Sequence, residues 1–307
     1  MDSKKVIVMM LLIMATSVLA VKTNSSERDW EALLLFRDAI KSDPRASLYN
    51  WTRENSENLC SSWYGIRCRE GTKRVVAIIL SSLQLEGTLS LSLATLSLLR
   101  TFNISDNSLK GGIPPEFGRL KALGTLDLSN NLLSGSIPKS LSNCTRLRWL
   151  GLAQNSLAGS IPTEFGRLFE LERLILFGNV LNGSIPDSLS NCTSLREFSI
   201  GSNNLAGPIP SFLGMMRSLA YLDFRFNSLD GLIPPDLSNC TELSYIDFSS
   251  NALGGKIPVE LGMLQKLEYL SLFSNRLENN IPSSLGNCSS LKFLYLGHNQ
   301  LSGSIPP

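Results

Sequence analysis

Hydrophobic and polar positions recur along most of this chain with a period of 24 residues. Each copy that is centred on an Asn has Leu eight residues before that Asn, apolar residues five and three before it, and Ile-Pro six and seven after it. Residues 123–138 show one complete copy, centred on Asn131. Apolar and polar residues alternate just before the centre, which is the pattern of a short strand with one buried face. The pattern therefore predicts one strand in every copy.

A single copy is too small to enclose its own Leu side chains, so copies have to stack before a core can form. Stacked strands lie about 4.8 Å apart and pair as one long parallel sheet. The pattern predicts ten such turns, with Leu83 at the centre of the first and with the last turn incomplete. We therefore expect a solenoid.

An Asn occupies the centre of nine of these turns. The chain leaves the strand there, so buried backbone N–H and C=O groups lack partners in the sheet. A short amide side chain can donate to and accept from such groups. We therefore predict an internal hydrogen-bonded ladder, a structural role, for Asn107, Asn131, Asn155, Asn179, Asn203, Asn227, Asn251, Asn275 and Asn299.

The composition excludes two other classes of protein. Charged residues make up 18% and hydrophobic residues 43% of the 307 residues, whereas a disordered chain is highly charged and poor in aliphatic residues. After residue 20 no apolar run approaches the roughly 18 residues that span a membrane. The net charge of +2 gives no electrostatic case for nucleic acid, which binds a clustered basic face.

The repeat L-x-x-L-x-L-x-x-N-x-L-x-G-x-I-P resembles the plant-type leucine-rich repeat. The preceding segment is similar to the N-terminal cap of plant leucine-rich-repeat receptor-like kinases and related receptor-like proteins, in residues 30–36, Asp43-Pro44, Leu48, Trp51 and residues 60–68. The resemblance covers nearly all of the chain after residue 20. It implies an α/β-type solenoid, a right-handed leucine-rich-repeat superhelix with a parallel concave β-sheet and an N-terminal helical cap. We expect no C-terminal cap within this sequence, because it ends inside a repeat.

We expect three regions: a signal peptide over residues 1–20, the cap over 21–72 and the repeats over 73–307. Lys4 and Lys5 precede an apolar run that ends in small residues, which is typical of a secretory signal cleaved after Ala20. Apolar spacing over residues 29–41 predicts a short amphipathic helix over the first turn. Two nearby Cys in a secreted chain can close a small loop, so we expect a disulfide between Cys60 and Cys68.

A secreted chain can also carry N-glycans. A glycan on Asn103 would stand on the outer face of the sheet and direct a partner to later turns. Each Asn that precedes a Cys has the alternative role of capping a local turn. The glycosylation sequons begin at Asn24, Asn50, Asn103, Asn143, Asn182, Asn191, Asn239 and Asn287.

The four other cysteines occur in every second turn, in a place that holds Leu or Met in the turns between. Two turns separate neighbouring cysteines by about 9.6 Å, which is more than a disulfide or a shared metal ion tolerates. We therefore predict buried free thiols that serve as small core residues, at Cys144, Cys192, Cys240 and Cys288.

The sequence contains few residues or motifs that are typical of a catalytic site. His298 is the only His, and its place directly before a ladder Asn favours a solvent-facing strand end. The sequence has no H-E-x-x-H, no glycine-rich phosphate loop and no C-x-x-C motif. Asp223 and Asp247 are expected to be neighbours on an exposed face, where screening makes a catalytic explanation unnecessary. We predict that this chain is not an enzyme and has no metal site and no cofactor.

The outward side chains of the strands lie six, four and two residues before each central Asn, and they are free to vary. They are small and polar in the first two turns, and aromatic or charged in many of the later ones. Trp, Tyr and Arg supply much of the energy in protein interfaces. The predicted ligand-binding residues are Trp149, Arg173, Phe177, Glu197, Tyr221, Asp223, Arg225, Tyr245, Asp247, Tyr269 and Phe273.

Some of these residues have a structural alternative. Tyr is common in this place of the family's repeat, so Tyr221, Tyr245 and Tyr269 could instead stack on one another. Phe177 and Phe273 are stronger candidates, together with Arg225, because their column otherwise holds Ser, Gly or Ala. An exposed Phe on a strand has no packing role unless a partner covers it.

The resemblance implies an extracellular binding module, the ectodomain of a plant receptor-like kinase or receptor-like protein or a fragment of one. It would act in cell-surface signalling, in the apoplast or on the outer face of the plasma membrane. Its partners would be a peptide or protein ligand and a co-receptor ectodomain. The alternatives are a secreted cell-wall protein that inhibits pathogen polygalacturonases and a co-receptor or scaffold that binds through an edge of the coil. The chain ends inside a repeat, which predicts that any kinase domain and membrane span would lie downstream.

Overall fold

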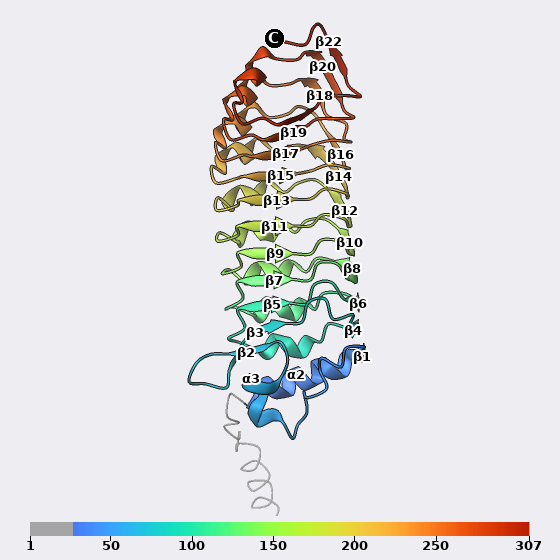
Figure 1. Cartoon of the computed structure of the whole chain (residues 1–307), viewed down its shortest axis with the longest axis vertical. Helices are drawn as coiled ribbons and strands as arrows, with labels where there is room; N and C mark the ends of the chain where they lie inside the picture. Colours follow the sequence, from blue (N-terminus) through green and yellow to red (C-terminus); the bar gives the residue numbers. More distant parts are fainter. Residues whose placement is uncertain (1–26, 307) are drawn as a thin grey trace, which may run out of the picture.

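The computed structural model describes residues 27–306, so the expected signal peptide and the sequon at Asn24 lie outside the described residues. The chain forms an elongated stack of turns, with the N-terminal cap at one end (Figure 1). A typical turn has a strand of one sheet, a strand of a second sheet and a short 3₁₀ helix. The predicted solenoid is therefore the observed fold.

The ten predicted strands, together with β2 of the cap, form a sheet of 11 strands, the concave sheet. Its paired residues hold equivalent positions in successive turns, as in Leu126 opposite Leu150 and Leu150 opposite Leu174, so every strand keeps the same face inward. Only the first pair is antiparallel, where β2 of the cap covers the edge of β3. The strands are β2 (Ile66–Cys68), β3 (Val75–Ile79), β5 (Thr101–Asn103), β7 (Thr125–Asp127), β9 (Trp149–Gly151), β11 (Arg173–Ile175), β13 (Glu197–Ser199), β15 (Tyr221–Asp223), β17 (Tyr245–Asp247), β19 (Tyr269–Ser271) and β21 (Phe293–Tyr295).

A second sheet, which the sequence pattern did not predict, follows the central Asn of each turn. The Leu two residues after the Asn is buried in all of these turns but the last, as at Leu157 and Leu181, so buried and exposed residues alternate in this segment as well. The sequence does not predict this strand because it contains a Gly at positive φ, such as Gly159 at 78°, and Gly is typical of turns. One part comprises β1 (Ile40–Ser42), β4 (Glu86–Thr88), β6 (Ser108–Gly111), β8 (Leu132–Ser136), β10 (Ser156–Gly159), β12 (Val180–Gly183), β14 (Asn204–Pro208) and β16 (Ser228–Asp230), and the other β18 (Gly254–Lys256), β20 (Arg276–Asn280) and β22 (Gln300–Ser302).

Short 3₁₀ helices form the side of the coil opposite the concave sheet. Most of them follow an extended Pro, such as Pro138 at φ −65°, because the ring fixes φ where the chain leaves the second sheet. They are η2 (Leu91–Thr95), η3 (Pro115–Arg119), η4 (Lys139–Asn143), η5 (Thr163–Arg167), η6 (Asp187–Asn191), η7 (Ser211–Met215), η8 (Pro235–Asn239), η9 (Val259–Met263) and η10 (Ser283–Asn287).

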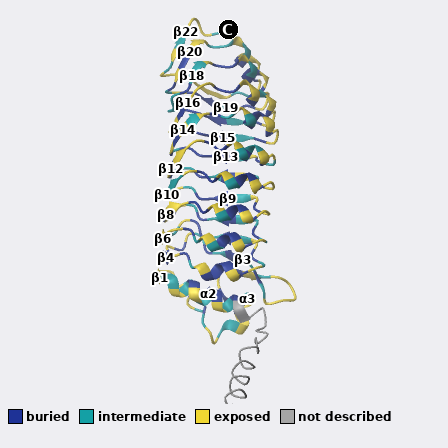
Figure 2. Ribbon diagram, turned by 180° about the vertical axis from the view of Figure 1, so that it is seen from behind, coloured by how far each residue is buried: buried dark blue, intermediate teal, exposed yellow. Residues whose placement is uncertain are grey.

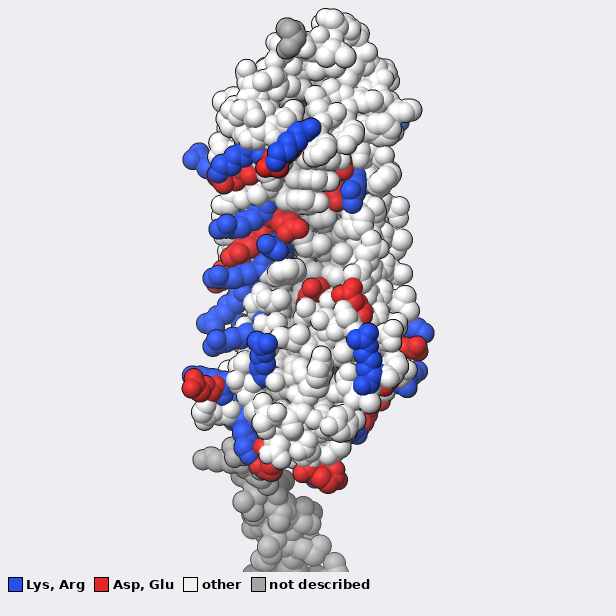
Figure 3. All heavy atoms as spheres, in the orientation of Figure 1, with Lys and Arg blue, Asp and Glu red and all other residues white. Residues whose placement is uncertain are grey.

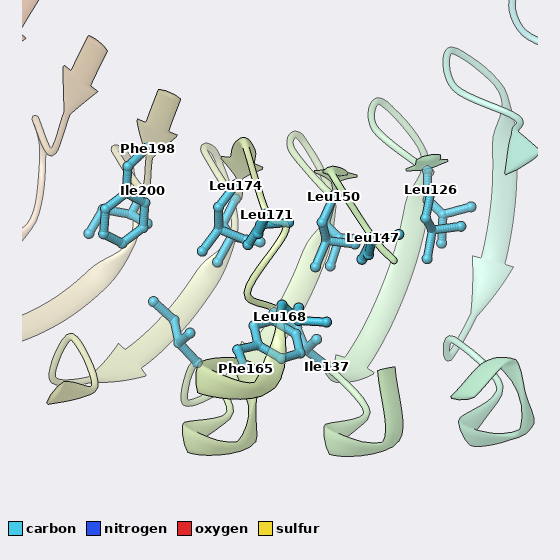
Figure 4. Packing of buried hydrophobic residues seen from close by; sticks show 14 of the residues in the cluster. Leu126, Ile137, Leu147, Leu150, Phe165, Leu168, Leu171, Leu174, Phe198 and Ile200 are labelled. Carbon is cyan, nitrogen blue, oxygen red and sulfur yellow. The ribbon is translucent and has the colours of Figure 1, made fainter. Parts of the chain in front are cut away.

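One hydrophobic core runs through the whole stack. Figure 4 shows Leu126, Leu150 and Leu174 of successive concave strands pointing toward Phe165 and Leu168 on the opposite side. All five side chains are fully buried. Figure 2 shows the same alternation of buried and exposed residues in turn after turn. Because each buried side chain of this kind contributes about 1.5–3 kcal/mol, stacking rather than any single turn stabilises the fold.

The Asn side chains form the predicted kind of ladder. Asn203 Nδ2 donates to the carbonyl oxygens of Leu176 in the preceding turn (3.1 Å) and of Ile200 in its own turn (3.0 Å). Asn203 Oδ1 accepts the backbone N–H of Leu181 at 3.0 Å. The Leu176 oxygen also accepts from Asn179 at 3.0 Å, so one carbonyl serves two amides. Equivalent bonds to the preceding turn recur at all nine positions.

The cap closes the first turn with α2 (Glu27–Ala39), η1 (Ser56–Asn58) and α3 (Leu59–Ser62). The helix ends at Ala39, two residues before the predicted end, because β1 pairs with β4 instead. Asp29 joins the cap to the repeats, since its carboxylate accepts the Val75 N–H at 2.8 Å and pairs with Arg74 Nε at 3.0 Å. The expected disulfide between Cys60 and Cys68 is present.

Neighbouring turns are of two kinds that pack as pairs. In one kind, the 3₁₀ helix holds a Gly so close to the next turn that a Cβ on Gly118 would lie 2.3 Å from the Ser140 oxygen. The other kind bonds back to the first, since Ser140 Oγ donates to the Pro115 oxygen at 2.6 Å and Cys144 Sγ to the Phe117 oxygen at 3.3 Å. The same close glycines recur at Gly166, Gly214 and Gly262, and the same thiol donors at Cys192, Cys240 and Cys288.

We expect Asn203→Ala to lower the free energy of unfolding by about 3 kcal/mol, because it leaves several buried backbone groups without a partner. The neighbouring Asn204→Ala is the matched control, since Asn204 is exposed, and it should change stability by less than about 0.5 kcal/mol. Urea unfolding followed by circular dichroism measures both. Equal shifts for the two variants would contradict a structural ladder.

The thiols of the four free cysteines should be unreactive in the folded protein. All four are buried, and burial raises the pKa of Cys144, Cys192 and Cys240 to about 11 and also raises the pKa of Cys288. The thiolate, which is the reactive form, is therefore scarce near pH 8. We expect a thiol reagent to label no cysteine rapidly in the native protein and four in urea without reductant. Rapid native labelling of all four would show that they are accessible.

Candidate binding site on the concave sheet

The predicted ligand-binding residues lie on consecutive strands of the concave sheet, from β9 to β19 and the loops that follow them. The structure brings them together in two groups. Parallel register places each side chain beside its counterpart in the next turn, as in Trp149 opposite Arg173 and Arg173 opposite Glu197. Contacts within each group therefore run along the stack.

The first group is a row of three side chains. The Arg173 guanidinium carbon lies 4.8 Å from the centre of the Trp149 ring, which is a cation–π contact. Arg173 Nε also pairs with Glu197 Oε2 at 3.4 Å. Arg173 is exposed and the other two are half-buried. The row therefore offers an aromatic face, a cation and an anion side by side.

The second group contains the three tyrosines, which do stack on one another. Ring centres lie 4.3 Å apart between Tyr221 and Tyr245 and 4.5 Å apart between Tyr245 and Tyr269, with nearly parallel rings. This stacking explains their presence without a ligand. The rings remain only half-buried, so their exposed parts are still open to a partner.

The expectation that Asp223 and Asp247 are exposed is wrong. Both are only 2% exposed, because the tyrosine rings and neighbouring strands surround them. Arg225 lies next to both carboxylates, with Nε 3.5 Å from Asp223 Oδ2 and Nη1 3.7 Å from Asp247 Oδ2. Ser249 Oγ donates to Asp247 Oδ1 at 2.5 Å. The two acids therefore hold Arg225 in place and do not face solvent.

Phe177 has an internal partner, which corrects the expectation that only a ligand could cover it. The Arg225 guanidinium carbon lies 5.1 Å from the centre of the Phe177 ring, although the two residues are two turns apart. Gly201 occupies the same place in the turn between them. A Cβ there would lie 2.8 Å from Asp223 Oδ1 and 3.0 Å from Phe177 Cδ2, so Gly201 leaves the space that the contact needs.

Two Phe residues near the ends of these strands remain open. Phe273 is 39% exposed and makes an edge contact with His298, whose ring centre is 4.8 Å away. Phe226 is 57% exposed and has φ 52°, a left-handed conformation that is unusual for a bulky residue. The sequence-based prediction misses Phe226. The sequence does contain a feature that could have indicated Phe226. It lies directly before Asn227, at a position where the other turns have Asp, Asn, Gln, Ser, Gly or His.

The sequon Asn residues differ in their surroundings. Asn103 is half-buried on β5, and its Oδ1 accepts the Ser105 N–H at 3.0 Å. Asn50 Nδ2, the atom that a glycan would occupy, donates to the Ser62 oxygen. Five others are exposed, four of them at the C-terminal ends of 3₁₀ helices: Asn143, Asn182, Asn191, Asn239 and Asn287.

The geometry of the concave sheet indicates binding of a partner, because exposed aromatic and charged side chains lie side by side on it. Residues 27–306 include no cluster of three or more His, Cys, Asp or Glu that could hold a metal ion. Within the same range, no helix is long and apolar enough to cross a bilayer. His298, the one His of the chain, is exposed between β21 and β22, and its ring makes the edge contact with Phe273 described above.

The pKa of Asp223 should make stability depend on pH. Burial raises it from 3.8 to about 6, opposed by Arg225 and reinforced by Asp247. The native state then holds this proton more tightly than the unfolded chain, so the Asp223 contribution to stability falls as pH rises between about 4 and 6.

We therefore expect Asp223→Asn to raise the melting temperature at pH 7, by an amount that corresponds to roughly 1–3 kcal/mol, and to have little effect near pH 4. The control is Asp127→Asn, in the same place of an earlier turn, where the side chain is only half-buried. A gain that is the same at both pH values would show that desolvation of the Asp223 carboxylate is not the cause.

Two kinds of protein-family model match the sequence of this chain. One described as leucine rich repeat N-terminal domain matches residues 26–69. Others described as leucine rich repeat match residues 97–157, 170–192, 218–240, 266–288 and 290–307. Together they cover the cap and most of the stacked turns.

Similar proteins include plant receptor kinases. Protein MALE DISCOVERER 2 of Arabidopsis thaliana is 42% identical over 92 residues, which are 30% of this chain and 13% of that protein. The solved leucine-rich-repeat ectodomain of the Arabidopsis thaliana receptor kinase GASSHO1/SCHENGEN3, in complex with CASPARIAN STRIP INTEGRITY FACTOR 2, has a TM-score of 0.79 and 34% identity over 92% of this chain and 36% of that one. The Arabidopsis receptor kinase HAESA, solved with the peptide hormone IDA and the co-receptor SERK1, has a TM-score of 0.65 and 33% identity over 89% of this chain and 54% of that one. The chain spans only part of the length of these relatives.

The capped stack and its internal Asn ladder define a leucine-rich-repeat solenoid. The chain belongs to the plant leucine-rich-repeat family, in the form found in the ectodomains of receptor-like kinases and receptor-like proteins.

Proposed function

We propose that this chain is the ligand-binding part of a plant cell-surface receptor and that its ligand is a peptide that lies along the concave sheet. A co-receptor ectodomain would join the complex. Kinase activity of the whole receptor would belong to a segment beyond this chain, and the module itself would work in the apoplast, at the outer face of the plasma membrane.

The observation that carries this proposal is the continuous track of aromatic and charged side chains across β9 to β19. Trp149, Arg173 and Glu197 form its first part, and the tyrosine stack with Arg225 forms its second part. A peptide that crosses several strands can contact both. The relatives support the same ligand class, because HAESA was solved with a peptide hormone and a co-receptor.

The residues of the track have different roles in this proposal. Phe226 and Phe273 expose apolar surface, so covering it on binding is favourable by about 25 cal/mol per Å². Arg173 and the tyrosine edges supply polar contacts at the exposed side. The buried Asp223 and Asp247 position Arg225, so we assign them a supporting role rather than direct contact with the ligand.

Peptides selected from a displayed library of random linear peptides on the immobilised chain provide the test. We expect the selected peptides to bind the double variant Phe226→Ser/Phe273→Ser at least tenfold more weakly, a loss of about 1.4 kcal/mol or more, measured by calorimetry. Unchanged thermal melting of the variant would show that it is folded.

The matched control is Leu132→Ser, which removes a comparably exposed apolar side chain (52%) from the second sheet instead of the concave sheet. It should leave the affinity unchanged. Peptides that bind the double variant as well as the original chain, or that respond equally to Leu132→Ser, would contradict a binding site on the concave sheet.

A further inference from the structure

Basic side chains gather along one edge of the solenoid, which Figure 3 shows as a column of Lys and Arg. This basic edge lies where each turn leaves its 3₁₀ helix and approaches the concave sheet. Seven of its residues are exposed and make no ion pair within the described part of the chain. They are Arg100, Arg119, Lys121, Arg146, Arg167, Arg196 and Arg217.

The two acidic residues on the same stretch of the edge are partly neutralised by one arginine. Glu170 and Glu172 both pair with Arg148, at 3.2 Å and 3.5 Å. The last turns differ, because each Lys on their edge pairs with a Glu of the preceding turn. Lys266 lies 2.7 Å from Glu242, and the equivalent pair joins residues 292 and 268 at 2.8 Å. One half of this edge is therefore basic and the other half is neutral, although the net charge of the whole chain is only +2.

The unpaired cations recur from turn to turn, at places that lie seven to twelve residues before the central Asn. Six consecutive turns, centred on residues 107 to 227, each contribute at least one. Backbone bonds such as Arg148 N–H to the Gly124 oxygen (2.8 Å) and Arg196 N–H to the Glu172 oxygen (2.8 Å) hold these loops in the register of the sheet. The six turns therefore span about 24 Å in steps of about 4.8 Å. A compact anion could reach two or three of these cations, whereas a linear polyanion could reach all six turns.

An aromatic side chain lies within the same edge. Phe169 is 58% exposed and follows η5 in the turn that also contributes Arg167. More than half of the Phe169 side chain is therefore open to a partner. It offers a flat apolar surface on which the C–H face of a sugar ring can stack. The combination of spaced cations and an exposed ring favours an acidic polysaccharide over an acidic peptide.

We propose that the basic edge binds a linear polyuronate, a polysaccharide with one carboxylate on each sugar, as in demethylated pectin of the plant cell wall. This site is separate from the concave track, so a polysaccharide and a peptide could occupy the chain together. The sequons at Asn143 and Asn191 lie on the same edge, where a large glycan would compete with the polysaccharide. The protein for the test is therefore trimmed with an endoglycosidase.

Immobilised polygalacturonate and its fully methyl-esterified form are the probes. We expect binding to polygalacturonate with an affinity that falls linearly on a log–log plot against salt concentration, and no binding to the neutral ester. Arg119→Gln/Arg146→Gln/Arg167→Gln should weaken binding at least tenfold and make the salt dependence shallower. Phe169→Ala should weaken binding without changing the salt dependence.

The control Lys266→Gln/Lys292→Gln alters the neutral half of the same edge and should leave binding unchanged. Polygalacturonate binding that survives the triple Arg variant, or equal binding of the esterified form, would overturn the proposal. Equally tight binding of polyglutamate would assign the edge to acidic peptides instead. Peptides selected on the concave sheet should still bind the triple variant, so this site and the proposed receptor function can fail separately.

Discussion

Stacking of successive turns in strict register is the constraint on which the rest of the structure depends. Each ladder Asn donates to carbonyl oxygens in its own turn and in the preceding one, and its own oxygen accepts a backbone N–H from that preceding turn. Buried backbone groups are thus satisfied at the one corner where the sheet cannot serve them. Because the same bonds recur in every turn, side chains that are far apart in sequence become neighbours at a fixed spacing.

Much of this arrangement follows from the sequence. The period and the alternation before each Asn predict the strands of the concave sheet, the inward Leu and the outward columns that contain Trp149 and Arg173. The burial of the four spaced cysteines follows from the same pattern. The second sheet could not be predicted in the same way, because its Gly residues at positive φ resemble turn residues. Its paired residues are also not equivalent positions of the repeat, as in Ala158 opposite Val180, so the period does not reveal their register.

The candidate site was harder to predict than the fold. The pattern shows which way a side chain points but not how far its neighbours reach. Asp223 and Asp247 point outward and are nevertheless buried, since the large side chains around them cover that part of the sheet. Arg225 reaches Phe177 across Gly201, a contact over two turns that a one-turn period does not contain. The basic edge could not be predicted from the net charge either, because a sum over the chain does not say where in space each charge lies.

The two kinds of turn bear on how such a chain can grow or shrink. Gly118 fits against Ser140, and the next turn bonds back through its Ser and Cys side chains, so the natural building block is a doublet of turns. Recombination that inserts or deletes a whole doublet keeps every glycine opposite its matching partner. Loss of a single turn would instead place two turns of the same kind together. Gene duplication in this architecture should therefore proceed in even numbers of turns. Each such event lengthens the concave sheet by two strands.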